Sequence, residues 1–197
     1  MDTNSISAPI KTGLLAYGMS GKVFHAPFLH VHPAFELYAV TERTKKLATV
    51  DYPELRSYSS VPQLLADSEI ELVVVNTPNY LHYEHTKAAL LANKHVLVEK
   101  PFTSTSTEAK ELFALAKERN LQIMVYQNRR YSSDFLSVQE VLNSGALGDI
   151  IELNFRFDRY KYQIGPKKFK EEPYPASGIL YDLGAHILDQ IISLYGK

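Results

Sequence analysis

Residues 10–21, IKTGLLAYGMSG, join an apolar run to a glycine-containing turn. Ala16, Gly18 and Gly21 occupy the glycine positions of a dinucleotide-binding fingerprint. There the chain turns tightly, a bare Cα lets a pyrophosphate approach, and a helix begins with its N-terminus aimed at the phosphates. Ala16 departs from the pattern, which is acceptable if its φ is negative. The stretch predicts a dinucleotide site that includes Ser20, although a glycine turn without a ligand has the same local sequence.

A P-loop is the main competing phosphate motif for this turn. It would need glycine at position 16 and serine or threonine at position 23, around Gly21-Lys22. The chain has Ala16 and Val23 at these positions. Both ends of the motif are missing, so we do not expect a phosphate-hydrolysing NTPase.

Strand-like and helix-like segments alternate on both sides of this turn. Strands are expected over residues 10–16, 35–41, 71–76, 95–98 and 121–126. The clearest helix covers 106–119, where Thr105 and Glu108 form a capping box, and another covers 80–93. The unbroken apolar run 72–75 fits a strand that is buried on both faces. The expected fold is α/β, a Rossmann doubly wound parallel sheet.

The pattern changes after about residue 130. A helix is expected over 133–144, a strand with alternating apolar side chains over 150–159, a loop over 160–175 and a helix over 179–195. One such strand and its helices cannot bury a core of their own. We therefore divide the chain into a flexible tail (1–9), a dinucleotide-binding domain (10–130) and the beginning of an α+β open-sheet second domain (131–197) that looks truncated.

The composition excludes several classes of protein. The chain has 197 residues, 45% of them hydrophobic and 22% charged, and its net charge is −1. Nucleic-acid binding usually needs a basic excess, which is absent. There is no cysteine, and the polar N-terminal residues do not form a signal peptide. The apolar runs are too short to cross a bilayer. We expect a cytoplasmic protein without nucleic-acid or membrane partners.

The second expected strand ends at Thr41-Glu42-Arg43, which bears on the choice of dinucleotide. An acidic side chain at this point accepts hydrogen bonds from the adenosine ribose and repels a 2′-phosphate. Glu42 therefore favours NAD slightly. Arg43 and the lysines at 45 and 46 keep NADP open, and a solvated charged turn is the alternative interpretation.

Four later motifs resemble those of a known family. They are Asn76-Thr77-Pro78-Asn79 with His82, Glu99-Lys100-Pro101, Tyr126–Arg130, and Gly178–His186. Together they resemble the Gfo/Idh/MocA family of sugar and inositol oxidoreductases over about residues 10–196. The segment His25-Ala26-Pro27-Phe28, with the last two motifs, is most similar to its scyllo-inositol-dehydrogenase-like branch.

The resemblance implies roles for individual residues. Lys100 matches the catalytic lysine, in a Lys-Pro peptide that is commonly cis in the family, and Asp182 and His186 match residues that meet the substrate. A lysine acts as an acid–base near neutral pH only when its surroundings lower its pKa. The expected cofactor contacts are Ala16, Gly18, Ser20, Gly21, Glu42, Arg43, Thr77, Asn79, His82, Glu99 and Asn128. No metal site is expected, since Asp182 and His186 lack a third ligand.

These roles predict an NAD(P)-dependent dehydrogenase that acts on a polyol, cyclitol or sugar. In the family, the second domain floors the substrate pocket and typically mediates dimerisation, so a homodimer is expected of the full-length form. A dinucleotide-binding regulatory protein, or an inactive fragment of such an enzyme, is the alternative. Lys100, Asp182 and His186 favour the enzyme, whereas the short second domain predicts poor turnover by the isolated chain.

Overall fold

A computed structural model describes residues 8–160, 162–163, 165 and 168–196. The chain forms two compact units, one up to Val125 and one from Tyr126 onward. Most of the tail expected over 1–9 lies outside the described residues.

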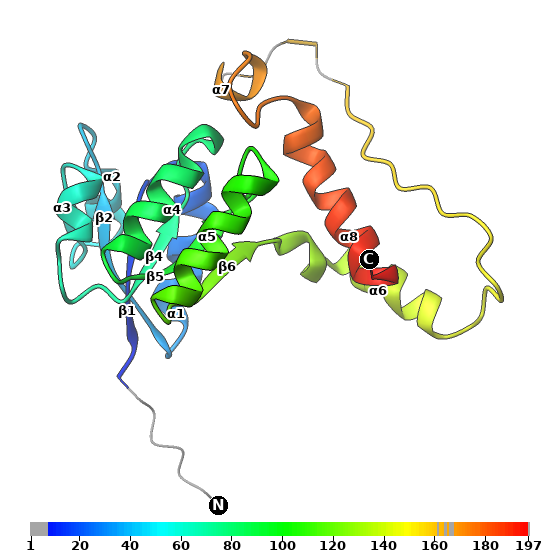
Figure 1. Cartoon of the computed structure of the whole chain (residues 1–197), viewed down its shortest axis with the longest axis horizontal. Helices are drawn as coiled ribbons and strands as arrows, with labels where there is room; N and C mark the ends of the chain where they lie inside the picture. The colour runs from blue at the N-terminus through cyan, green and yellow to red at the C-terminus, as the bar shows by residue number, and fades with distance from the viewer. Residues whose placement is uncertain (1–7, 161, 164, 166–167, 197) are drawn as a thin grey trace, which may run out of the picture. The chain divides into compact units, whose positions relative to one another are not determined.

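The N-terminal unit is built on a six-stranded sheet (Figure 1). Its strands are β1 (Ile10–Leu14), β2 (Phe35–Thr41), β3 (Arg56–Tyr58), β4 (Leu72–Val75), β5 (His95–Glu99) and β6 (Ile123–Tyr126). The order across the sheet is β3-β2-β1-β4-β5-β6, and β1 to β5 pair in parallel. This confirms the doubly wound sheet. The sequence prediction missed β3, whose short run lacks a strong apolar pattern.

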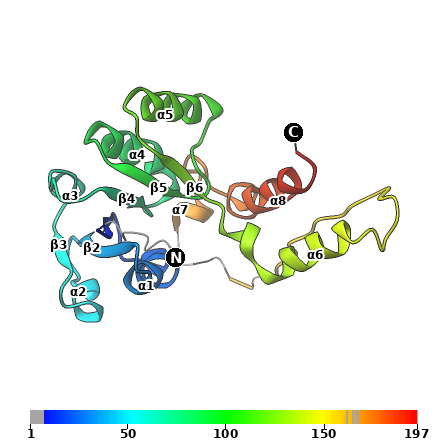
Figure 2. The ribbon, with the colours of Figure 1, turned by 90° about the horizontal axis from the view of Figure 1, so that it is seen from below.

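Helices cover both faces of this sheet, and Figure 2 shows α4 and α5 on the opposite face from α1. The helical segments are η1 (Gly21–His25), α1 (Ala26–Val31), α2 (Leu47–Asp51), α3 (Val61–Leu65), η2 (Asn79–Leu81), α4 (His82–Leu91) and α5 (Ser106–Glu118). Val73, Val74 and Val75 of β4 are fully buried. Val73 and Val75 belong to one apolar cluster and Val74 to the other, as expected of a strand covered on both faces.

The predicted helix ends of this unit are confirmed. The Thr105 side chain accepts a hydrogen bond from the Glu108 amide (3.2 Å), and the Glu108 carboxylate accepts one from the Thr105 amide (3.1 Å). α4 ends before Asn93 and α5 before Asn120, both with positive φ. Asparagine tolerates this left-handed conformation, which terminates a helix.

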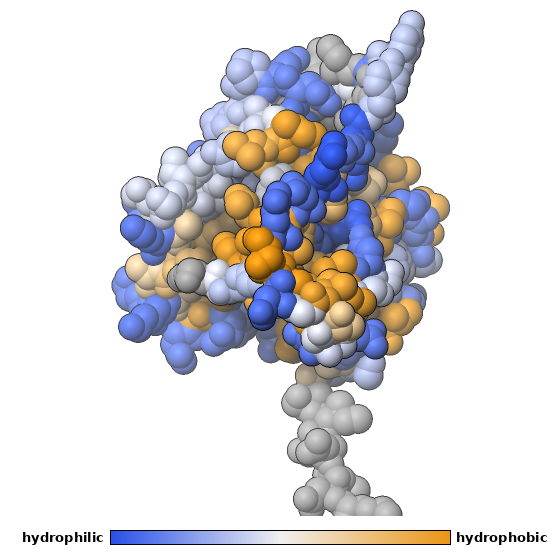
Figure 3. Space-filling model, turned by 90° about the vertical axis from the view of Figure 1, so that its right-hand side faces the viewer, coloured by the Kyte–Doolittle hydropathy of each residue, from blue (hydrophilic) through white to orange (hydrophobic). Residues whose placement is uncertain are grey.

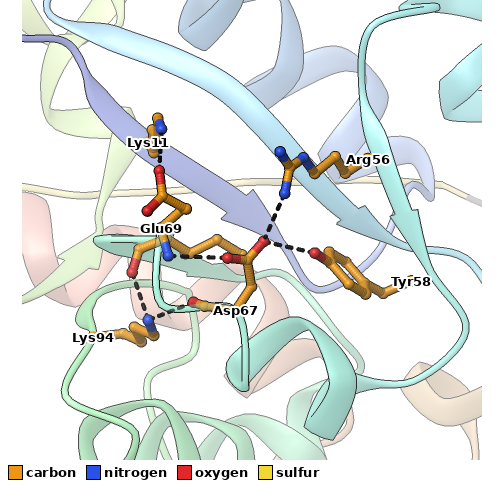
Figure 4. Close-up of polar contacts among 7 residues, drawn as sticks. Lys11, Arg56, Tyr58, Asp67, Glu69 and Lys94 are labelled. Atoms are coloured by element: carbon orange, nitrogen blue, oxygen red, sulfur yellow. Dashed lines mark hydrogen bonds and ion pairs between the residues drawn. The ribbon is translucent and has the colours of Figure 1, made fainter.

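A polar cluster lies where strands β1, β3 and β4 begin (Figure 4). The carboxylate of Asp67 accepts hydrogen bonds from the Tyr58 hydroxyl (2.6 Å) and the Glu69 amide (2.9 Å), and Arg56 lies 3.6 Å away. Burial alone raises the pKa of Asp67. The hydrogen bonds and the charges of Arg56 and Lys94 outweigh burial, so the pKa lies below its ordinary value.

Lys94 is a buried member of the same cluster. Its Nζ donates hydrogen bonds to the carbonyl oxygens of Asp67 and Ile70, each at 2.7 Å (Figure 4). Burial lowers the pKa of Lys94. The ammonium ties the loop before β4 to the end of α4.

The C-terminal unit is mostly helical in its described part. It contains η3 (Asn128–Tyr131), α6 (Ser133–Asn143), α7 (Lys168–Glu171), η4 (Leu180–Gly184) and α8 (Ala185–Tyr195). Arg130 of η3 binds the Asp189 carboxylate of α8 through two nitrogens, at 2.7 and 2.6 Å. The expected helices over 133–144 and 179–195 are confirmed, and α7 lies within the expected loop 160–175.

The strand predicted over 150–159 is wrong for this structure. Residues 150–160 have no regular secondary structure, and no described segment pairs with them. Alternation is a local pattern, whereas a strand needs the hydrogen bonds of a neighbour. The polar side chains still pair two residues apart, as in the Arg156–Asp158 ion pair at 3.0 Å. Ile151 is 93% exposed, and Figure 3 shows apolar patches on the surface.

Candidate functional site

The glycine turn is fixed to the neighbouring strand end by one asparagine. The Oδ1 of Asn76 accepts a hydrogen bond from the Ala16 amide (2.9 Å), and its Nδ2 donates to the Ala16 carbonyl (2.8 Å). Ala16 follows β1 and Asn76 follows β4, where the strand order reverses. In open α/β sheets, ligands bind at this reversal, outside the carboxyl ends of the strands. The φ of Ala16 is not positive, so alanine is acceptable at the first glycine position of the fingerprint.

Gly18 and Gly21 differ in what surrounds them. A Cβ on Gly18 would meet no atom within 4 Å, so the protein itself leaves this Cα open. A Cβ on Gly21 would lie 2.4 Å from the Ala16 carbonyl oxygen and 2.8 Å from Asn76 Nδ2. Gly21 is therefore needed for the close contact of helix and strand, while Gly18 provides space for a ligand. Both observations fit a dinucleotide pyrophosphate at this turn.

Helical structure begins at Met19, directly after the open Gly18. Its N-terminal amides therefore face the turn, where a phosphate would bind. The helix widens over η1, because the Ala26 amide bonds to the Gly21 carbonyl, five residues back. Pro27 explains the wide turn, since proline has no amide hydrogen and its ring would clash in a regular helix. His25 and Ala26 are both buried there.

Glu99, the last residue of β5, is tied to this helix. Its Oε1 accepts hydrogen bonds from the Ser20 hydroxyl (2.5 Å) and from His25 Nε2 (2.8 Å). Burial alone raises the pKa of Glu99. The hydrogen bonds from His25 and Ser20 and the charge of Lys100 outweigh burial, so the pKa lies below its ordinary value. Glu99 is therefore a carboxylate at neutral pH.

Two histidines after β4 hold Thr77. His82 Nε2 lies 2.9 Å from the Thr77 carbonyl oxygen, and its Nδ1 lies 2.7 Å from the Pro101 carbonyl oxygen. His85 Nδ1 contacts the Thr77 hydroxyl at 3.0 Å. Burial lowers the pKa of both histidines. His82 is 1% exposed, so the structure gives it a bracing role between two strand ends, and its contact with the cofactor stays a prediction.

Lys100 directly follows Glu99 and is half-buried. The Lys100–Pro101 peptide is cis, as the family resemblance implied. Asn79, another expected cofactor contact, is buried at the start of η2. The carboxyl ends of β1, β4 and β5 thus carry the glycine turn, Thr77 and Lys100 at one edge of the sheet.

The end of β2 carries Glu42, whose carboxylate faces the protein. Its Oε1 accepts a hydrogen bond from the Ala48 amide of α2 (2.8 Å), and its Oε2 accepts one from the Ser57 hydroxyl (3.3 Å). Glu42 is only 5% exposed. Lys46 donates to the Glu42 carbonyl (3.0 Å) and to Ser57 (2.8 Å), whereas Arg43 is exposed.

The other expected site residues belong to the C-terminal unit. Asn128 begins η3, Asp182 lies in η4, and His186 is buried in the first turn of α8. Asp182 Oδ1 accepts a hydrogen bond from Lys170 Nζ at 2.5 Å. Their functional roles remain predictions, as do those of the cofactor contacts.

Sequence reasoning missed two residues that shape this site. Asn76 was part of a recognised motif, but nothing local revealed that its amide holds Ala16, sixty residues away. His25 was noted only for its family resemblance, and its contact with Glu99 depends on the wide turn of η1. Both contacts join distant segments, which a local pattern does not report.

In the described ranges of the chain, no group of three or more histidine, aspartate or glutamate side chains could hold a metal ion. No described helix has the length and apolar character needed to span a membrane.

The sheet order, the glycine turn and the helix that begins directly after it define a Rossmann domain of the NAD-binding class. Residues 10–127 match the family model of the oxidoreductase family with an NAD-binding Rossmann fold, and residues 135–197 match the GFO/IDH/MocA C-terminal domain. The chain belongs to the Gfo/Idh/MocA family of oxidoreductases.

Individual relatives agree with this assignment. An uncharacterised oxidoreductase of Schizosaccharomyces pombe is 48% identical, over 96% of this chain and 52% of its own length. The scyllo-inositol 2-dehydrogenase (NADP(+)) of Bacillus subtilis is 40% identical, over 95% and 52%. The crystal structure of an oxidoreductase from Bacillus cereus superposes with a TM-score of 0.82 at 35% identity, over 95% and 53%. The chain thus spans about half the length of these relatives.

Proposed function

We propose that this chain belongs to an NAD(P)-dependent dehydrogenase or reductase that interconverts a secondary alcohol and a ketone in a cyclic polyol or sugar. One observation carries the proposal. Lys100 follows β5 next to Glu99, and Ser20 ties Glu99 to the helix that begins at the open glycine turn. This supports an acid–base role for Lys100 at the edge of the sheet where a dinucleotide would bind. The inositol dehydrogenase among the relatives supports a cyclic polyol.

The proposed reaction needs a proton acceptor and a hydride acceptor. Lys100 Nζ, in its neutral form, accepts the proton of the substrate hydroxyl as the carbonyl bond forms. The bound nicotinamide supplies the hydride acceptor. In the reverse direction, the Lys100 ammonium returns the proton to the carbonyl oxygen. Asp182 and His186 are proposed to bind substrate hydroxyls, since an aspartate carboxylate accepts hydrogen bonds and a neutral histidine ring can donate one and accept one.

Substitution of Lys100 in the full-length protein tests its role as the acid–base group. NADPH or NADH formation, followed at about 340 nm with a panel of inositols and sugars, measures turnover. Lys100→Ala should lower kcat by about 100-fold or more, because general acid–base catalysis contributes that much, while cofactor affinity stays nearly constant. Lys110→Ala, on an exposed face of α5, is the control. Normal turnover by Lys100→Ala would refute the catalytic role.

We further propose that the cofactor is NADP rather than NAD. The sequence favoured NAD through Glu42, but that carboxylate accepts hydrogen bonds from Ala48 and Ser57 and is nearly inaccessible. Arg43 is exposed beside it and suits a 2′-phosphate. The NADP(+) dependence of the Bacillus subtilis relative supports this choice.

Binding measurements separate the two cofactors. Titration of the chain with NADPH and NADH should show tighter binding of NADPH. Arg43→Ala should reduce that preference by roughly 10-fold or more, since a charged hydrogen bond contributes about 1.5–3 kcal/mol. Lys110→Ala should keep the preference. Equal affinities for the two cofactors in the unaltered chain would contradict the assignment.

A further inference from the structure

A dinucleotide bound at the glycine turn would have one definable end near Glu99. The glycine turn after β1 takes the pyrophosphate, and the end of β2 takes the adenosine ribose. The nicotinamide half must then extend to the other side of the reversal point, over β4 and β5. Glu99 ends β5 and precedes Lys100. Its carboxylate therefore belongs to the nicotinamide end of the site.

The two oxygens of Glu99 have different surroundings. Oε1 accepts the hydrogen bonds from both Ser20 and His25. Within the described part of the chain, no side chain donates to Oε2. The glutamate side chain is 13% exposed. One oxygen is thus committed to the protein, and the other is left to accept a hydrogen bond from a bound molecule.

His25 is well placed to fix that arrangement. It is 2% exposed, and its Nε2 lies 2.8 Å from Glu99 Oε1. Glu99 is ionised and only accepts hydrogen bonds, so Nε2 must carry the proton. A buried ring has little rotational freedom, and it therefore orients the carboxylate more firmly than a serine hydroxyl can. The wide turn of η1 is what brings His25 to this position.

We propose that His25 is a positioning residue for the nicotinamide half of the cofactor. By donating to Oε1, it holds the Glu99 carboxylate so that Oε2 accepts a hydrogen bond from the carboxamide or ribose hydroxyls of the nicotinamide riboside. The inference rests on the proposed function, because it requires a bound dinucleotide. In this proposal His25 acts through Glu99 and not by direct contact with the cofactor or the substrate.

The test compares a ligand that has the nicotinamide riboside with one that lacks it. NADP+ and 2′-phospho-ADP-ribose are titrated against the unaltered chain, His25→Leu and His25→Gln by calorimetry, together with NAD+ and ADP-ribose. His25→Leu should weaken binding of the full dinucleotides by about 10-fold, the effect of a lost charged hydrogen bond, and leave the truncated ligands within about twofold. His25→Gln keeps a donor near Nε2 and should restore most of the affinity.

Controls separate positioning from folding. His30→Leu changes an exposed histidine of the same helix and should alter neither affinity. If His25→Leu does not fold, His25→Asn, whose shorter amide does not reach Glu99 Oε1, should show the same selective loss. An equal loss for both kinds of ligand, or no loss, overturns the inference. Failure of the unaltered chain to bind any dinucleotide would instead refute the proposed function.

Discussion

Replacing Gly18 or Gly21 by alanine should have opposite effects on stability, although both glycines belong to one turn. Gly18 has no positive φ, and its added Cβ would meet no atom within 4 Å. Alanine at such a position restricts the unfolded chain and stabilises a protein by about 0.4–1 kcal/mol. The same methyl group would project into the proposed pyrophosphate position. We expect Gly18→Ala to be slightly more stable than the unaltered chain and to bind the dinucleotide at least about 10-fold more weakly.

In Gly21→Ala, the added methyl group would clash with the backbone of the protein itself. The added Cβ would lie 2.4 Å from the Ala16 carbonyl oxygen, so the helix must move by about 1 Å to reach ordinary contact distance. Overpacking of this kind costs about 1–3 kcal/mol. The movement also strains the Asn76 hydrogen bonds to Ala16, each contributing about 1 kcal/mol. The gain in helix propensity is about 1 kcal/mol, so we expect a net loss of roughly 1–3 kcal/mol.

Urea denaturation followed by circular dichroism measures the stability, and titration with NADPH measures binding. Asn143→Ala, at an exposed position of α6, is a control. It should change neither the cofactor affinity nor the stability of the N-terminal unit. If Gly18→Ala destabilised the chain as much as Gly21→Ala, the distinction between ligand space and helix packing would be refuted. Unchanged dinucleotide affinity in Gly18→Ala would also count against the proposed position of the pyrophosphate.

Two further predictions concern the cluster at the start of the strands. Lys94→Met removes the donor to the carbonyl oxygens of Asp67 and Ile70 and should lower the free energy of unfolding by about 2–4 kcal/mol, whereas Lys110→Met should have little effect in the same urea titration. The pKa of Asp67 is lower in the folded chain than its ordinary value of 3.8, so the ionised carboxylate stabilises the fold above pH 3.8. This contribution is lost as the pH falls through the folded-state pKa. Asp67→Asn should therefore be less stable than the unaltered chain at pH 7, and the difference should shrink towards pH 3; a constant difference would contradict the assignment.

Sequence patterns predicted the N-terminal unit well because its elements are strongly patterned. Consecutive apolar residues identified β4, and the Thr105–Glu108 capping box identified the start of α5. β3 was not predicted, because three residues are too few to show an apolar pattern. The strand expected over 150–159 failed for the opposite reason. Its alternation is clear, but hydrogen bonds to another segment decide whether a strand forms, and the described residues offer none.

The candidate site was predictable where a motif has a local cause. The glycine turn and the cis Lys100–Pro101 peptide followed from motif and resemblance. The orientation of Glu42 did not, because its bonds to Ala48 and Ser57 depend on how α2 and β3 fold back beside β2. Side-chain direction at a strand end is a property of the tertiary structure, so the sequence alone left the cofactor choice open.

The wide turn of η1 also sets the rotational phase of the helix that follows. Each residue of an α-helix advances about 100° around the axis, and the wide turn absorbs one additional residue, so the residues beyond it keep the phase of a regular helix. Deleting a single residue from the turn would restore a regular helical turn and leave Leu29 facing the core, but it would remove the wide turn that brings His25 to Glu99. The length of this segment therefore matters more for the contact between His25 and Glu99 than for the packing of the helix beyond it.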